Sequence, residues 1–183
     1  MDYLDNKGVV LTRRDNFQLL RECYQKIVDI FMEDGIKGLD KVLKYINEMI
    51  DDIKFNRINK DSLIVTKTLK GPYKSQNIPH VVLAKKIAER DPGAAPRQND
   101  RIPYIFIDNG WLKATTPQFM KVEDPNFAKQ HNLPVDTEYY IKALMNPLCE
   151  ILELFMDKPD EMFKKITNDY RKERLARLKK QSK

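Results

Sequence analysis

Few residues of this 183-residue chain are spaced for catalysis. The two histidines, His80 and His131, have no cysteine, histidine or carboxylate at the spacing that zinc ligands need. The adjacent carboxylates Asp51 and Asp52 fall at the expected polar edge of a helix, where solvation explains them better than a metal ion does. The sequence also contains no glycine-rich phosphate loop and no nucleophile elbow. It therefore predicts neither catalytic nor metal-binding residues in this chain.

Binding chemistry is better represented, in the segment TKTLKGPYK at residues 66–74. Lysine ammonium groups and hydroxyl groups of this kind bind phosphate oxygens and sugars without regard to base sequence. A solvated surface loop would have the same composition, so the pattern alone leaves both interpretations open. The pair Arg13 and Arg14, at the start of an expected helix, is equally compatible with a phosphate clamp and with a plain surface pair.

The net charge of +6 is unevenly distributed along the chain. Residues 54–101 carry +7 and residues 171–183 carry +6, whereas residues 1–53 carry −3 and residues 102–170 carry −4. A basic block interleaved with threonine, tyrosine and histidine favours a polyanion as partner, because a localised field attracts phosphates.

Composition excludes several classes of protein. Cys23 and Cys149 lie far apart on apolar helical patterns, which indicates buried thiols in a reducing compartment and no disulfide framework. No apolar run approaches the ~20 residues of a transmembrane helix, and Asp2 and Asp5 stand where a signal peptide would be basic and then apolar. We therefore expect an intracellular protein without a membrane partner.

Apolar periodicity predicts a mainly α fold with a small β component, an α+β class, in one ordinary domain or one domain with an appendage. Asp15 or Asn16 is expected to cap the first helix. Helices are expected from residue 17 to 31, 39 to 53, 79 to 88, 125 to 131, 136 to 155 with a kink at Pro147, and from 159 into the basic end. Strands are expected at 8–12, 63–66 and 102–107, with a hairpin-like region at 111–122.

Five collinear blocks resemble the C-terminal part of family B DNA polymerases, most of all the delta-type catalytic subunit. The blocks are KGVVLTRRDN at 7–16, LIVTKTLK at 63–70 followed by Tyr73, PHVVLAKKIAERDPGAAP at 79–96, DRIPYIFI at 100–107, and EDPNFAKQHNLPVDTEYYIKALMNPL at 123–148. Any single block is a weak signal, whereas all five in order cover roughly residues 7–155 and identify the family.

The resemblance implies a division into the end of a palm domain at 1–16, a thumb domain of helical bundle and short strands at 17–158, and a basic C-terminal helix or tail at 159–183. It implies that the chain grips primer-template duplex nonspecifically, through backbone contacts, during DNA replication in the nucleus or at a viral replication site. Tyr104, Tyr139 and Tyr140 are expected to pack. The implied DNA-binding residues are Arg13, Arg14, Thr66, Lys67, Lys70, Tyr73, Lys74, His80 and Arg101.

Some features of the family are missing. The DxxSLYPS-type and YGDTDS-type motifs, whose aspartates hold two magnesium ions, do not occur, nor do the exonuclease motifs or paired cysteine modules. The parent polypeptide is thus expected to be a DNA-directed DNA polymerase, a nucleotidyltransferase with Mg²⁺ in its palm, and this chain alone to be inactive and without a cofactor. Asn99 stands where the family often has glycine, so the turn before Arg101 is expected to differ.

The implied partners are primer-template DNA and the remaining palm, exonuclease and N-terminal domains of a polymerase. Two alternatives stay open. The C-terminal helix, with Met162, Phe163, Ile166 and Tyr170 on one face, could dock a processivity factor. Alternatively, the chain could be a free-standing DNA-binding protein derived from a polymerase.

Overall fold

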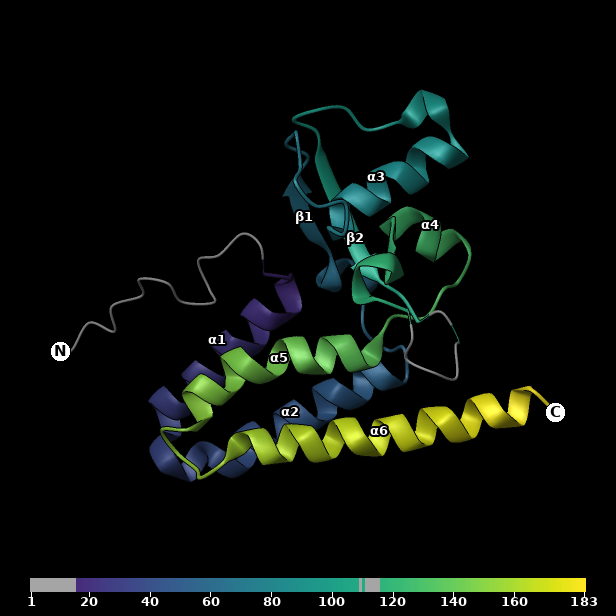
Figure 1. Cartoon of the computed structure of the whole chain (residues 1–183). Helices are drawn as coiled ribbons and strands as arrows, with labels where there is room; N and C mark the ends of the chain where they lie inside the picture. The colour runs from purple at the N-terminus through teal and green to yellow at the C-terminus, as the bar shows by residue number, and fades with distance from the viewer. Residues whose placement is uncertain (1–15, 109, 111–115) are drawn as a thin grey trace.

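The structure is a computed structural model that describes residues 16–108, 110 and 116–183. It consists of a layer of four helices with a smaller sheet-containing part standing on it (Figure 1). The layer comprises α1 (Gln18–Asp34), α2 (Leu39–Lys54), α5 (Thr137–Leu152) and α6 (Pro159–Gln181). The sheet part comprises β1 (Val65–Thr68), α3 (Pro79–Arg90), β2 (Arg101–Phe106), β3 (Val122–Glu123) and α4 (Pro125–Gln130), with short 3-10 turns η2 (Lys60–Leu63), η3 (Pro92–Ala94) and η4 (Gln118–Lys121). The predicted class, mainly α with a small β component, is confirmed.

The expected strand at 8–12 and the arginine pair Arg13 and Arg14 lie outside the described residues, as does part of the hairpin-like region at 111–122. The described end of that region is not a hairpin of its own. It forms η4 and then β3, which pairs with β2.

Apolar residues spaced three and four apart form the buried faces of the helices in the layer, as predicted. The buried faces include Cys23 and Ile27 of α1 and Ile46 and Ile50 of α2. The predicted cap of α1 by Asn16 is wrong, because the N-cap position belongs to Phe17, which makes no side-chain capping bond. Burial of the Phe17 ring, edge-on against Tyr140 at a centroid distance of 5.4 Å, thus overrides the capping preference of Asn16.

Two glycines permit the tight connection from α1 to α2, the 3-10 turn η1 (Gly35–Gly38). Gly35 has φ +60°, in the left-handed region where a side chain is strained. At Gly38 a Cβ atom would come within 2.8 Å of Cγ2 of Ile30, so only glycine lets the two helices approach this closely. The short turn makes α1 and α2 antiparallel neighbours.

The sheet is antiparallel, with strand order β1-β2-β3. Its first strand begins at Val65, two residues later than the predicted start at Leu63. Leu63 instead ends η2 and is fully buried, and its carbonyl accepts a 3.5 Å hydrogen bond from the Tyr140 hydroxyl. The apolar residue at the start of the run therefore fills the core, and the strand pairing follows it.

Helix α6 packs along α5 (Figure 1). Phe163, Thr167 and Tyr170 are buried in this contact. Two arginines hold the second half of the helix, since Arg171 pairs with Glu138 of α5 and Arg174 pairs with Asp108 after β2. The helix is therefore anchored to the layer well beyond its apolar segment. Helix α5 ends at Leu152, three residues before the predicted end, with Pro147 inside it.

Candidate nucleic-acid interface

The lysine-rich segment lies at one end of the β1–β2 pair and is called here the lysine hairpin, defined as residues 66–80 with Arg101. Pairing continues beyond the strands, because the Leu69 N–H donates to the Asp100 carbonyl at 2.8 Å and the Asn99 N–H donates to the Leu69 carbonyl at 2.7 Å. Asn99 has φ +73°, a conformation that glycine adopts readily and asparagine tolerates. Asn99 therefore adopts a backbone conformation that glycine favours, and a difference of this turn from the family's stays a prediction.

Strand alternation places two of the predicted contact residues on opposite faces of the sheet. Lys67 is opposite the buried Ile102, whereas Thr66 is opposite the exposed Pro103. Thr68, on the same face as Thr66, is opposite the exposed Arg101. The structure thus brings the predicted residues to one end of the sheet without placing them all on one face.

The Tyr73 hydroxyl joins three parts of the hairpin. It accepts the backbone N–H of Lys70 at 2.6 Å and lies 3.0 Å from Nε2 of His80 and 3.5 Å from the carbonyl oxygen of Thr68. The Tyr73 and His80 rings also meet edge to face, with centroids 5.6 Å apart. Tyr73 therefore holds the loop against β1 and the start of α3, while Lys70 and Lys74 are exposed.

His80 is held largely uncharged at neutral pH. Burial lowers its pKa below the ordinary value, and the positive charge of Lys67 lowers it further. A neutral imidazole can accept the Tyr73 proton at Nε2, which fits the 3.0 Å separation. The positive charge of the hairpin at neutral pH therefore comes from its lysines and Arg101.

Helix α3 begins beside this pair of rings. Pro79 occupies its first turn, and Ile78 at the N-cap provides no side-chain hydrogen bond. The positive end of the α3 dipole and its first N–H groups therefore lie at the hairpin, where they add to the lysine charges.

Several basic residues of the segment 54–101, which carries +7, stabilise the fold through contacts within the protein. Arg90 pairs with both carboxylate oxygens of the buried Glu123, at 2.7 and 3.0 Å, and its guanidinium stacks on Phe127 at 3.7 Å.

Three further basic residues of this segment bind groups of the protein. The Lys86 ammonium donates to the carbonyls of residues 120 and 122, and burial lowers its pKa. Arg57 pairs with Asp52 and Lys60 donates to the Leu133 carbonyl. The net charge of residues 54–101 therefore overstates the number of cationic side chains that a ligand could bind.

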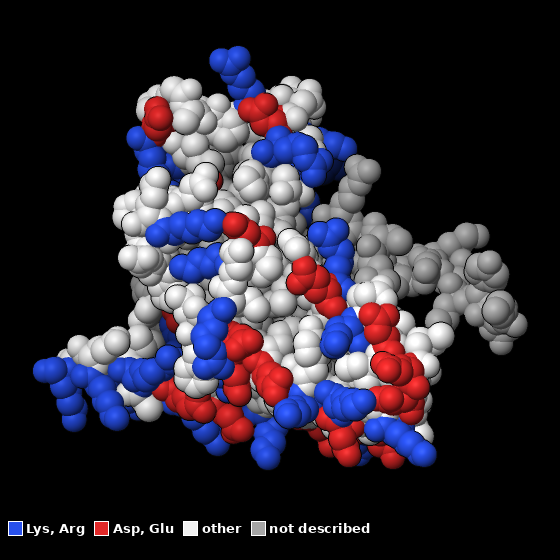
Figure 2. Space-filling view, turned by 180° about the vertical axis from the view of Figure 1, so that it is seen from behind, with Lys and Arg blue, Asp and Glu red and all other residues white. Residues whose placement is uncertain are grey.

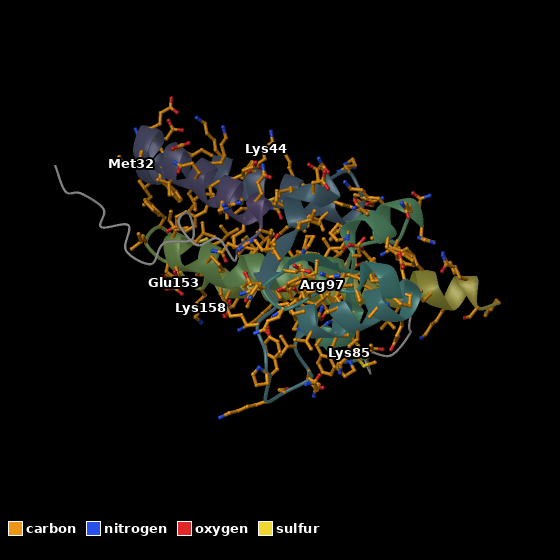
Figure 3. The ribbon with its side chains drawn as sticks, turned by 90° about the horizontal axis from the view of Figure 1, so that it is seen from above. Met32, Lys44, Lys85, Arg97, Glu153 and Lys158 are labelled. Carbon is orange, nitrogen blue, oxygen red and sulfur yellow. The ribbon has the colours of Figure 1, made fainter. Side chains whose placement is uncertain are left out.

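Two basic residues in this part of the molecule were not assigned from the sequence. Lys85 and Arg97 are both exposed, and both belong to the sheet part (Figure 3). Only the overall charge of the segment pointed to them. Seen from the opposite side to Figure 1, Lys and Arg side chains are spread over the sheet part, the helical layer and the end of α6, whereas most Asp and Glu side chains lie over the helical layer (Figure 2).

The structure also shows where the predicted packing tyrosines and the two cysteines lie. Tyr104 and Tyr140 are buried, and Tyr139 packs against Phe106, so all three tyrosines pack as expected. Both cysteines are buried, and neither forms a disulfide. Across the described ranges, no three His, Cys, Asp or Glu side chains gather as a metal site, and no helix there is long and apolar enough to cross a membrane.

The face of the C-terminal helix that suggested docking is already occupied. Phe163 and Tyr170 are buried, and Met162 and Ile166 pack against the core. The interpretation of this face as an open docking surface is therefore wrong, because α5 covers it.

Known proteins resemble most of the chain. The model of DNA polymerase family B matches residues 1–155. A DNA polymerase of Acanthamoeba polyphaga mimivirus is 34% identical over 173 residues, which cover 92% of this chain and 10% of that protein. A DNA polymerase delta catalytic subunit of Dictyostelium discoideum is 36% identical over 165 residues, which cover 88% of this chain and 14% of that protein.

A solved structure has a similar fold. It is the family B DNA polymerase from the hyperthermophilic archaeon Pyrobaculum calidifontis, with a TM-score of 0.63 and 21% identity over 79% of this chain and 18% of the other. The chain thus spans only 10 to 14% of the length of the two relatives named above. The match over residues 1–155, together with the similarity to the viral and delta-type proteins, shows that the chain belongs to DNA polymerase family B.

Proposed function

We propose that this chain is the thumb region of a DNA-directed DNA polymerase and that it grips primer-template duplex through the DNA backbone. The observation that carries the proposal is the lysine hairpin. It presents the exposed Lys70, Lys74 and Arg101 at one end of the sheet, with the start of α3 beside them. Phosphates neutralised by such cations release counterions, which stabilises binding without any reading of base sequence.

The proposed division of the chain keeps residues 1–16 as the end of the palm, 17–158 as the thumb and 159–183 as the C-terminal helix. The 158/159 boundary falls between α5 and α6, which pack together. Catalysis would belong to the parent protein, a nucleotidyltransferase that works in the nucleus or at a viral replication site. Magnesium would bind in the parent's palm, and none of the steps proposed for this chain depends on it.

Internal contacts of the hairpin support the same proposal. Tyr73 binds the backbone N–H of Lys70 and packs on His80, so this part of the loop is restrained by contacts that do not depend on DNA. Preorganised cations cost less conformational entropy on binding than lysines on a disordered tail. Residues 171–183 carry a higher net charge, +6 against +4 for the hairpin, but they lie beyond residue 155, where the match to the family model ends.

Titration of the ¹⁵N-labelled chain with a primer-template duplex, followed by amide NMR, tests the proposal. We expect the largest shift changes at residues 66–80 and 101, with the same pattern for duplexes of unrelated sequence. A duplex that perturbs only α6, or that binds with strong sequence preference, would contradict the assignment of the hairpin. The variant Lys70→Ala, with Lys44→Ala in the helical layer as control, then shows whether the shifts report contact.

A further inference from the structure

A groove lies between the end of α2 and the second half of α6, away from the lysine hairpin. It consists of two adjoining hollows of about 390 and 340 Å³ that share Lys54, Tyr170 and Arg177 as lining residues. In α6, residues 174, 178 and 181 line the first hollow and residues 173 and 176 line the second. Because these positions fall on adjacent faces of one helix, the two hollows flank the line from Tyr170 to Arg177.

Apolar atoms form much of the floor of this groove. Ile53, Val135 and Tyr170 line the first hollow and are each at most 4% exposed. The second hollow is lined by Phe55, whose side chain is 62% exposed, and by Ala176. The Arg57 guanidinium lies over the Phe55 ring at 5.1 Å from its centroid, and the rest of the side chain is open to solvent beside the hollow.

The ridge between the hollows is cationic. Arg174, in the first hollow, is committed to Asp108 through two hydrogen bonds of 2.8 and 2.6 Å. Lys54 and Arg177 make no ion pair with any residue that the structure describes, and Arg177 lies over the Tyr170 ring at 5.9 Å. The groove thus offers two cations between a hollow of mixed polar and apolar lining and a mainly apolar hollow that Glu173 also lines.

We propose that this groove docks a segment of a partner protein in which apolar side chains flank a carboxylate. The carboxylate would pair with Lys54 and Arg177, and the apolar side chains would fill the hollows on either side and cover Phe55. Charge complementarity selects an acidic segment, and the paired hollows select a peptide. A nucleic-acid strand would also neutralise the cations, but it has no aliphatic side chains to fill two separate depressions.

Fluorescence anisotropy with the full chain tests the proposal. The probe is a labelled synthetic peptide with the repeated motif Leu-Glu-Phe-Asp, and the comparison peptides repeat Leu-Lys-Phe-Lys and Ser-Glu-Ser-Asp. We expect saturable binding of the first peptide alone. Equal binding of the Ser-Glu-Ser-Asp peptide, or displacement of the probe by a single-stranded oligonucleotide at equal charge concentration, would overturn the proposal.

Variants locate the binding. Arg177→Glu and Lys54→Glu should each weaken the peptide by about tenfold, since each sets a like charge against the carboxylate. Phe55→Ala should weaken it with both cations intact, and Lys165→Glu, an exposed change in the first half of α6, should have no effect. Circular dichroism confirms that each variant is folded. Unchanged affinity in folded Arg177→Glu and Phe55→Ala would place the peptide elsewhere and overturn the proposal.

Discussion

At the scale of single residues, Tyr73, which is predicted to contact DNA, also binds the backbone N–H of Lys70 within the hairpin. The Tyr73 hydroxyl is shared between the Lys70 N–H and His80. Its position in the sequence showed that it belonged to the hairpin, but not that its polar atom points inward. The sequence could predict which residues gather here. It could not predict which of them contact a ligand and which support the others, because that depends on hydrogen bonds made across the turn.

Tyr73→Phe keeps the ring and removes only the hydroxyl. We expect DNA affinity to fall a few-fold and the free energy of unfolding to fall by about 1 kcal/mol, the usual net value of one hydrogen bond. The slope of log affinity against log salt should not change, because no lysine is lost. The Lys70 amide should exchange its proton faster. Tyr24→Phe in α1 is the matched control. Weaker DNA binding with unaltered exchange at Lys70 would instead show that the hydroxyl contacts DNA itself.

The ion pair of Arg90 with Glu123 gives a second prediction at this scale. Glu123 is 3% exposed and also accepts the Asp124 N–H. Glu123→Ala should lower the free energy of unfolding by about 2 kcal/mol, because it removes two charge-assisted hydrogen bonds to Arg90 and leaves the Asp124 N–H without its acceptor. Urea unfolding measures this, with the exposed Glu173→Ala as control. Equal stability of the two variants would show that the pair has no structural role.

At the scale of elements, the apolar periodicity predicted the helices well and the strand boundaries less well. Repeats of three and four residues correctly indicated α1 and α2, since burial of one face is a local property of the sequence, and Pro79 at the first turn correctly indicated α3. The errors at the start of β1 and of α1 arise from contacts with residues far away in the sequence. Leu63 is drawn into the core and delays β1, and Phe17 takes the N-cap position because its ring is buried. Neither effect is visible in the neighbouring residues alone.

Helix α6 should be anchored in a pH-dependent way. Burial by itself would raise the pKa of Asp108, but the Arg174 guanidinium and the Gly110 N–H more than offset it, so the pKa is lowered. The pKa of Glu138 is likewise lowered, because Arg171 and Lys142 outweigh its burial. A carboxyl group whose pKa is lower in the folded chain than in the unfolded chain stabilises the fold above about pH 4, the pKa in the unfolded chain. This stabilisation is lost as the pH falls through the lower pKa of the folded chain.

The double variant Arg171→Gln and Arg174→Gln tests this dependence. At about pH 6 its free energy of unfolding should lie below that of the unchanged chain, and the difference should shrink as pH falls below about 4. Urea unfolding across this range measures both proteins. A difference that stays constant down to the lowest pH would show that the arginines act through packing and not through their ion pairs.

At the scale of the whole molecule, acidic side chains are distributed less evenly than basic ones. On the face that Figure 2 shows, most Asp and Glu side chains lie over the helical layer, whereas Lys and Arg side chains lie over the layer, the sheet part and the end of α6. Segment sums of charge predicted the basic character of residues 54–101. They could not separate Lys86 and Arg90, which hold the fold, from Lys70 and Lys74, which are exposed. The resemblance to family B was visible in five sequence blocks because their order survives where overall identity is about one third.

The central claim is that the lysine hairpin grips the DNA backbone. The most direct measurement is the salt dependence of duplex binding by the triple variant Lys70→Ala, Lys74→Ala and Arg101→Ala, beside a control with Lys37, Lys44 and Lys165 changed to Ala. Loss of three phosphate contacts should lower the salt slope by about 2.7 and weaken binding to all duplexes alike, whereas the control should keep nearly the full slope. Equal slopes for both triple variants would contradict the account.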